Sequence, residues 1–155
     1  MKLPPGWTRY GTRDDKNFTE IIRHQGRNAL RIVDRSSNET GISRDFPVQP
    51  GKFYQGTVQL TSLGKAGAEK VIRLQIRFLC KDGKATLAGG AVKLDGVTSF
   101  GGVAPANASG IRVYIYTSFN AEMDVALQSF KLEMLDEPPR TAGNPKNGYV
   151  PPVNK

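Results

Sequence analysis

Val71–Cys80, which reads V-I-R-L-Q-I-R-F-L-C, is the stretch that decides the fold. From Ile72 onward apolar side chains take every second position, and Arg73, Gln75 and Arg77 stand between them. Successive side chains of an extended strand point to opposite faces, so this spacing predicts a strand with one dry face and one polar face. The β-branched content also favours a strand. The polar face is either the solvated side of a half-buried strand or a surface for a polar ligand.

Two further segments, Phe53–Thr61 and Ile111–Ser118, repeat this alternation. Guanidinium, amide and hydroxyl groups in a row on a rigid sheet can donate hydrogen bonds to a polar ligand. The polar positions of these two segments are Gln55, Thr57, Gln59, Arg112, Tyr114 and Tyr116. If the three segments are neighbours in one sheet, we expect their side chains to form a single Arg/Gln/Tyr surface.

The rest of the chain consists of short apolar runs separated by turn signals. Strands are expected over 6–11, 18–23, 28–34, 42–48, 93–100 and 123–134. In the last strand apolar residues occupy odd-numbered positions up to Leu127 and even-numbered positions from Phe130. The alternation therefore changes at Gln128 and Ser129, which predicts a β-bulge. Residues 85–91, rich in glycine and small, are expected to be irregular, and residues 101–110 to be a loop. About nine strands and no convincing helix predict an all-β, antiparallel β-sandwich.

The composition predicts one domain and a tail. A chain of 155 residues can bury one core without staples. We therefore expect residues 1–135 to form the sandwich. Residues 136–155 hold five prolines and little to bury, so they are expected to be a Pro-rich linker or disordered tail.

The net charge and the lengths of the apolar runs limit the classes of partner that are expected. Twenty-two basic and fourteen acidic residues give a net charge of +8, which invites an anionic partner. Nucleic acid is the weaker alternative, because the basic residues are spread along the chain instead of being clustered. No apolar run approaches the roughly 18 residues of a membrane span, so we expect no membrane partner.

The residues that carry enzyme chemistry are sparse. With one histidine, His24, and one cysteine, Cys80, the chain cannot build a multi-histidine or four-cysteine metal centre. Cys80 falls on the apolar parity and is expected to be buried, which argues against a Cys–His nucleophile. The carboxylates are scattered, and no acid/base pair stands out by spacing. The sequence predicts a protein that is not an enzyme.

Five short motifs occur in order along the chain. They are Gly26-x-x-Ala29-Leu30-Arg31-Ile32, Pro50-Gly51-Lys52-x-Tyr54, Lys81-Asp82-Gly83, Pro105 ahead of Ile111-Arg112-Val113, and Phe130-Lys131-Leu132. In this combination the chain resembles the jelly-roll, galactose-binding-like carbohydrate-binding modules that are attached to glycoside hydrolases and polysaccharide lyases. The resemblance spans about residues 5–135.

The resemblance implies a non-catalytic module that holds a polysaccharide near a catalytic domain of the same protein. It also implies a secreted or cell-surface protein whose export signal is not among these residues. The arginines suit an acidic glycan, uronic-acid or sulfated, because guanidinium binds carboxylate or sulfate in a bidentate fashion. The carbohydrate-binding residues it suggests are Gln55, Arg73, Gln75, Arg77, Arg112, Tyr114 and Tyr116.

Relatives of that family often hold a structural calcium with an aspartate of the last strand. Here the corresponding position reads Gln128-Ser129, which leaves Asp124 as the candidate ligand. Calcium needs six or more oxygen ligands, and the sequence offers too few to name.

A different class of function also stays open: a structural or adhesion β-sandwich whose arginine and tyrosine side chains lie under a neighbouring domain.

Overall fold

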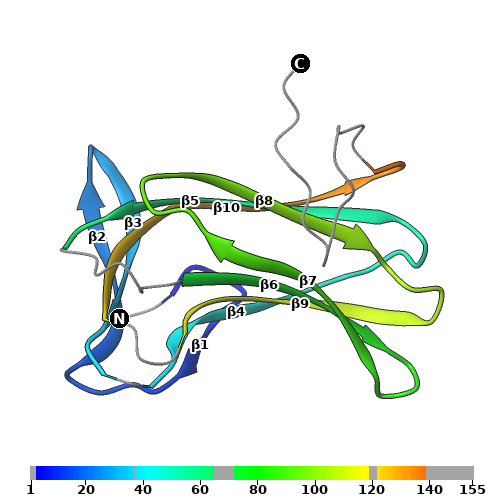
Figure 1. Ribbon diagram of the computed structural model, residues 1–155, viewed down its shortest axis with the longest axis horizontal. Helices are drawn as coiled ribbons and strands as arrows, with labels where there is room; N and C mark the ends of the chain where they lie inside the picture. The colour runs from blue at the N-terminus through cyan, green and yellow to red at the C-terminus, as the bar shows by residue number, and fades with distance from the viewer. Residues whose placement is uncertain (1–2, 37, 65–71, 119–121, 139–155) are drawn as a thin grey trace.

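The fold is built entirely from β-strands in the residues that the computed structural model describes, 3–36, 38–64, 72–118 and 122–138 (Figure 1). Within these ranges no helix is long and apolar enough to span a membrane. The strands are β1 (Trp7–Gly11), β2 (Asn17–His24), β3 (Arg27–Asp34), β4 (Thr40–Phe46), β5 (Phe53–Ser62), β6 (Ile72–Cys80), β7 (Ala85–Val92), β8 (Gly96–Val103), β9 (Ala108–Thr117) and β10 (Met123–Leu135).

The strands form two layers. Sheet A has the order β1-β4-β9-β6-β7 and sheet B the order β2-β3-β10-β5-β8. Neighbouring strands are antiparallel throughout both sheets. Figure 1 shows sheet B as the upper layer and sheet A as the lower one. The predicted antiparallel jelly-roll β-sandwich is confirmed, and the described residues form ten strands in place of about nine.

The alternation of β6 places one face of sheet A in the core. Leu74 and Ile76 are almost completely buried and lie opposite Ile115 and Val113 of β9. Fully burying such a side chain stabilises the fold by about 1.5–3 kcal/mol. The residues that alternate with these buried ones on β6 and β9 consequently point outward from the sandwich.

Three local expectations are wrong. Residues 85–91 belong to a regular strand, β7, because its pairing with β6 outweighs the low strand propensity of glycine. The next strand begins at Gly96 and continues to Val103, where a loop was expected. Cys80 is half-buried, since the register of β6 and β9 shifts between Leu79 and Cys80.

The last strand carries the predicted bulge. Its register with β5 shifts between Leu127 and Ser129, so Gln128 is the extra residue. The shift restores the apolar face: Phe130 and Leu132 pack against the core, as Leu127 does before the bulge. The strand ends at Leu135. Most of the expected tail, residues 139–155, lies outside the described residues, so the boundary at 135 stays a prediction.

A fully buried carboxylate lies at one end of the sandwich. Asp34 accepts hydrogen bonds from the Thr117 hydroxyl and, at 3.0 Å, from the Ser36 amide. The backbone N–H of Thr40 donates to the oxygen of Thr117 at 3.0 Å. Burial raises the pKa of Asp34 above its ordinary value, and the two hydrogen bonds oppose this only in part.

Asp34 should therefore make stability depend on pH. A carboxyl with a raised pKa binds its proton more tightly in the folded state, so its contribution is most favourable below 3.8, its ordinary pKa, and falls as the pH rises. We expect the parent-minus-variant difference in free energy of unfolding for Asp34→Asn to decrease between about pH 3 and about pH 7. Urea unfolding at a series of pH values measures it, and a difference that grows with pH would contradict the assignment.

Candidate functional site

The outer face of sheet A gathers six of the seven side chains expected to bind a ligand. They come from β6 and β9, which are hydrogen-bonded neighbours, so each residue on one strand stands directly opposite a residue on the other. The opposing pairs are Arg73 with Tyr116, Gln75 with Tyr114, and Arg77 with Arg112. These side chains are half-buried or exposed, in contrast to the buried residues between them.

Gln55 is not part of this surface. Its strand, β5, lies in sheet B, so Gln55 points away from sheet A together with Thr57 and Gln59. The expectation that all three alternating segments share one sheet is wrong for β5. Alternation shows which residues share a strand face, but the choice of sheet depends on pairing between distant segments.

Tyr10 joins the surface from β1, at the edge of sheet A. It lies opposite Gly41 of β4, which in turn lies opposite Tyr116. The Tyr10 ring reaches across the glycine and packs edge-on against Tyr114 and Tyr116, with centroid distances of 5.0 and 5.5 Å. Sequence reasoning missed Tyr10. The available signal was its odd spacing from Trp7, which puts the two rings on opposite faces.

We call the resulting surface the Arg/Tyr face. Its members share the outer parity of β1, β6 and β9 in sheet A. They are Tyr10, Arg73, Gln75, Arg77, Arg112, Tyr114 and Tyr116.

A shallow hollow of about 290 Å³ opens on the Arg/Tyr face beside β7. Arg73, Gln75 and Tyr116 line it, together with Gly89 and its neighbours on β7. Gly89 has a φ of +138°, and a Cβ there would come within 2.0 Å of the Leu74 carbonyl oxygen. The position therefore requires glycine.

Arg112 is held by a carboxylate at one end of the face. Its Nε and Nη2 atoms donate to the two oxygens of Asp45 at 2.6 and 3.2 Å. Hydrogen bonding from Arg112 lowers the pKa of Asp45 below its ordinary value. The carboxylate of Asp45 consequently offsets the positive charge of Arg112.

Arg77 and Arg73 keep more of their charge available. Arg77 donates from Nη2 to the Gln75 side-chain oxygen at 3.1 Å and stacks 5.3 Å from the centroid of the Tyr114 ring. Its Nε is buried without a hydrogen-bond partner, and neither arginine forms an ion pair within the described ranges. Like charges directly opposite each other, as in Arg77 and Arg112, destabilise a sheet. An anion bound above the two guanidinium groups would offset this repulsion.

Two tyrosines of the face remain neutral phenols near physiological pH. Burial, together with the Glu39 carboxylate that accepts from its hydroxyl at 3.0 Å, raises the pKa of Tyr10 to about 12. Burial also raises the pKa of Tyr116, followed by the charge of Glu39, while Arg73 and Arg77 act in the opposite direction. A neutral phenol both donates and accepts, as does a sugar hydroxyl.

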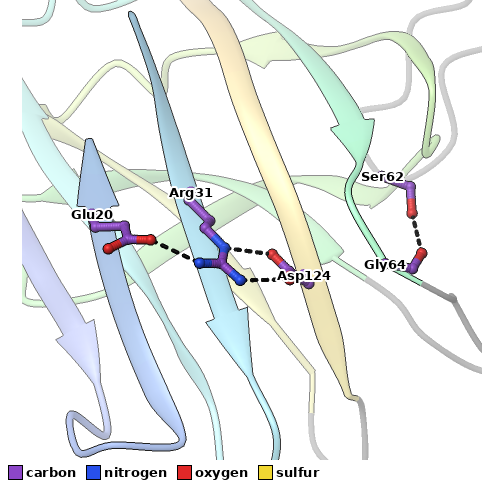
Figure 2. Close-up of polar contacts among 5 residues, drawn as sticks. All are labelled: Glu20, Arg31, Ser62, Gly64 and Asp124. Atoms are coloured by element: carbon purple, nitrogen blue, oxygen red, sulfur yellow. Dashed lines mark hydrogen bonds and ion pairs between the residues drawn. The ribbon is translucent and has the colours of Figure 1, made fainter. Parts of the chain in front are cut away.

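Asp124 is committed to an arginine. Arg31 donates to its two carboxylate oxygens at 2.9 and 2.8 Å and to Glu20 at 2.8 Å (Figure 2). These two acids raise the pKa of Arg31. The described part of the chain holds no group of three or more His, Cys, Asp or Glu residues that could bind a metal. With both oxygens used, Asp124 does not fit a calcium ion that needs six or more ligands.

Chelation should therefore leave the stability unchanged. We expect the same melting midpoint in a chelator and in added calcium, because Arg31 already neutralises Asp124. A midpoint that falls in the chelator would show that a set of metal ligands exists.

Arg31→Gln should lower the free energy of unfolding by about 1 kcal/mol, because a partly buried ion pair contributes more than an exposed one. Arg27→Gln, an exposed change on the same strand, is the control.

Sequence comparison finds no matching family model and no matching curated protein. Comparison with solved structures does find matches: the fold is that of the jelly-roll carbohydrate-binding modules. One match is the family 22 xylan-binding domain of Paenibacillus barcinonensis xylanase 10C, at 13% identity and a TM-score of 0.61, covering 85% of this chain and 87% of that one.

Two larger proteins contain the same fold. One is a structure of Clostridium thermocellum xylanase 10B that contains a family 22 carbohydrate-binding module and a family 10 glycoside hydrolase module, solved with xylohexaose. It matches at 16% identity and a TM-score of 0.60 over 90% of this chain. The enzymatically active domain of tailspike protein 4 of bacteriophage CBA120 matches at 13% identity and a TM-score of 0.65 over 84% of this chain. This chain spans 28% of the xylanase structure and 20% of the tailspike structure.

Proposed function

We propose that this protein is a non-catalytic carbohydrate-binding module that holds a polysaccharide on the Arg/Tyr face. One observation carries the proposal: β6 and β9 pair so that arginines, tyrosines and a glutamine stand in opposing rows on one rigid sheet. Sugar hydroxyls need such convergent donors and acceptors, and sugar rings pack their C–H faces on aromatic rings. The similarity of the fold to xylan-binding modules supports the same function.

The electrostatics of the face favour an acidic polysaccharide. Of the three arginines, only Arg112 has a carboxylate partner within the described residues. Arg73 and Arg77 form no ion pair there, and Arg73 lines the hollow of the face. Guanidinium groups bind carboxylates and sulfates with charge-assisted hydrogen bonds, which are about twice as strong as neutral ones. A uronic-acid or sulfated glycan is therefore the proposed ligand.

In its natural setting the module would target an attached catalytic domain to this glycan, outside the cell. Such an arrangement raises the local concentration of substrate around the enzyme, because the second binding event becomes intramolecular.

Affinity electrophoresis tests the proposal. Native gels containing alginate, pectin, ulvan or a glycosaminoglycan should retard the protein, and gels with neutral xylan or glucan should retard it less. Equal retardation by neutral glycans would remove the acidic part of the proposal. No retardation in any gel would leave the interdomain β-sandwich, in which the Arg/Tyr face packs on a neighbouring domain.

A further inference from the structure

A second cavity, separate from the Arg/Tyr face, opens between the two sheets. It has a volume of about 390 Å³, within the range of small-ligand pockets. β1 and β4 of sheet A form one wall, and β2, β3 and β10 of sheet B form the other. Trp7, Phe46 and Phe130 line it and contact one another, with centroid distances of 5.7 to 6.5 Å. We call it the edge cleft.

Arg44 places a positive charge inside this aromatic setting. It shares the inner parity of β4 with Ile42 and Phe46, and it lies directly opposite Trp7. Its guanidinium stacks 4.8 Å from the Phe46 ring centroid and 5.9 Å from the Trp7 ring centroid. Within the described residues it forms no ion pair. An arginine at an inward position without an acid conflicts with the local rules of folding, and such conflicts mark functional sites.

The surrounding chain keeps Arg44 in place. Gly6 has a φ of +87°, and a Cβ there would come within 2.8 Å of the Arg44 Nε. The N-terminal segment thus passes closely over the guanidinium. Stacking between two rings and this close backbone fix the direction of the donors, which lowers the entropy lost on binding an acid.

The inner side of the edge cleft is formed by side chains of the core. Its lining includes Leu30, Ile42 and Leu127, all of which belong to the hydrophobic core. A sugar unit that inserts between the sheets meets these core side chains at its inner side, which favours a single unit or a chain end over an internal unit. Asn28 and Gln128, the latter extruded by the β10 bulge, add amide groups to the lining.

We propose that the edge cleft binds a terminal uronic-acid residue, with its carboxylate on Arg44 and its sugar ring against Trp7, Phe46 and Phe130. The choice of a sugar acid rests on the proposed function, but the site is separate from the Arg/Tyr face. The module then has two loci: the open face takes internal units of the polymer, and the edge cleft takes an end.

The single tryptophan of the chain reports on the edge cleft directly. We would excite Trp7 selectively and titrate the protein with sodium glucuronate and sodium galacturonate at constant ionic strength. Glucose, acetate and benzoate serve as probes for the neutral ring, the bare carboxylate and an aromatic acid. We expect a saturable change with a uronate, and a roughly tenfold or larger loss of affinity in Arg44→Gln. Lys84→Gln, which removes an exposed charge in the β6–β7 turn, should bind like the parent.

The outcomes separate the two proposals. No saturable response to either uronate would overturn the edge-cleft site, as would an equal response to glucose or a response to benzoate alone. Gel retardation of the parent protein would then decide the Arg/Tyr face independently. Circular dichroism of Arg44→Gln shows whether the variant is folded; if it is not, Arg44→Lys, which keeps the charge and loses the planar stacking group, should show the weakened uronate response.

Discussion

Arg77→Gln should weaken binding of an acidic polysaccharide about tenfold to a hundredfold. A hydrogen bond to a charged group contributes about 1.5–3 kcal/mol, and Arg77 is an arginine of the face that forms no ion pair in the described residues. The variant should also keep its melting midpoint or exceed it, because it removes the like-charge pair with Arg112. Isothermal titration calorimetry and thermal unfolding measure the two effects.

Arg27→Gln is the matched control, since it makes the same change at an exposed position of sheet B. It should bind the polysaccharide with an affinity close to that of the parent. If Arg77→Gln and Arg27→Gln weaken binding by the same factor, the attraction comes from net charge and the Arg/Tyr face is not the binding surface. If binding falls only together with the melting midpoint, Arg77 is a structural residue.

Gly41→Ala should destabilise the protein by about 3 kcal/mol or more, and lower the melting midpoint by roughly 10 °C. A Cβ at position 41 would come within 2.1 Å of the Ile115 carbonyl oxygen and 2.6 Å of the Tyr116 Cα. Both are backbone atoms of the neighbouring strand, so they cannot rotate away. Relief requires β4 and β9 to separate, and Tyr10 would then lose its packing on Tyr116. Chemical denaturation followed by circular dichroism gives the free energy of unfolding.

Gly110→Ala makes the same chemical change in β9 and is the control. A Cβ there meets only Leu79 Cδ1, at 4.0 Å. Its effect should stay within about 0.5 kcal/mol. Comparable losses in the two variants would mean that glycine flexibility, and not the steric contact at position 41, explains the result.

The strands were predictable where side chains alternate strongly. β6 and β9 have clearly alternating apolar residues, and the change of alternation in β10 predicted a bulge near Gln128 and Ser129, where the register shifts. β7 was missed because Gly89 and its small neighbours carry no apolar signal. Its existence depends on hydrogen bonds to β6, which the backbone makes whatever the side chains are.

The site was predictable in its residue types and only partly in its membership. The six residues of β6 and β9 come together because their strands pair, while Gln55 went to the other layer. Tyr10 and Gly41 were missed, since their roles exist only once β1 and β4 lie side by side. Arg44 was visible on an apolar parity, but only the aromatic rings around it give that position a meaning.

Some of the charges of the molecule are paired and others are not. On sheet B, Arg31 is neutralised by Glu20 and Asp124, and Lys131 lies 3.1 Å from Glu133. On the Arg/Tyr face of sheet A, Arg73 and Arg77 form no ion pair in the described residues. A polyanion approaching through solvent is attracted by the net charge of +8 and, near this face, by these two arginines before any contact forms. Such steering weakens when salt shortens the Debye length, so the association rate should fall steeply with ionic strength while the dissociation rate changes little.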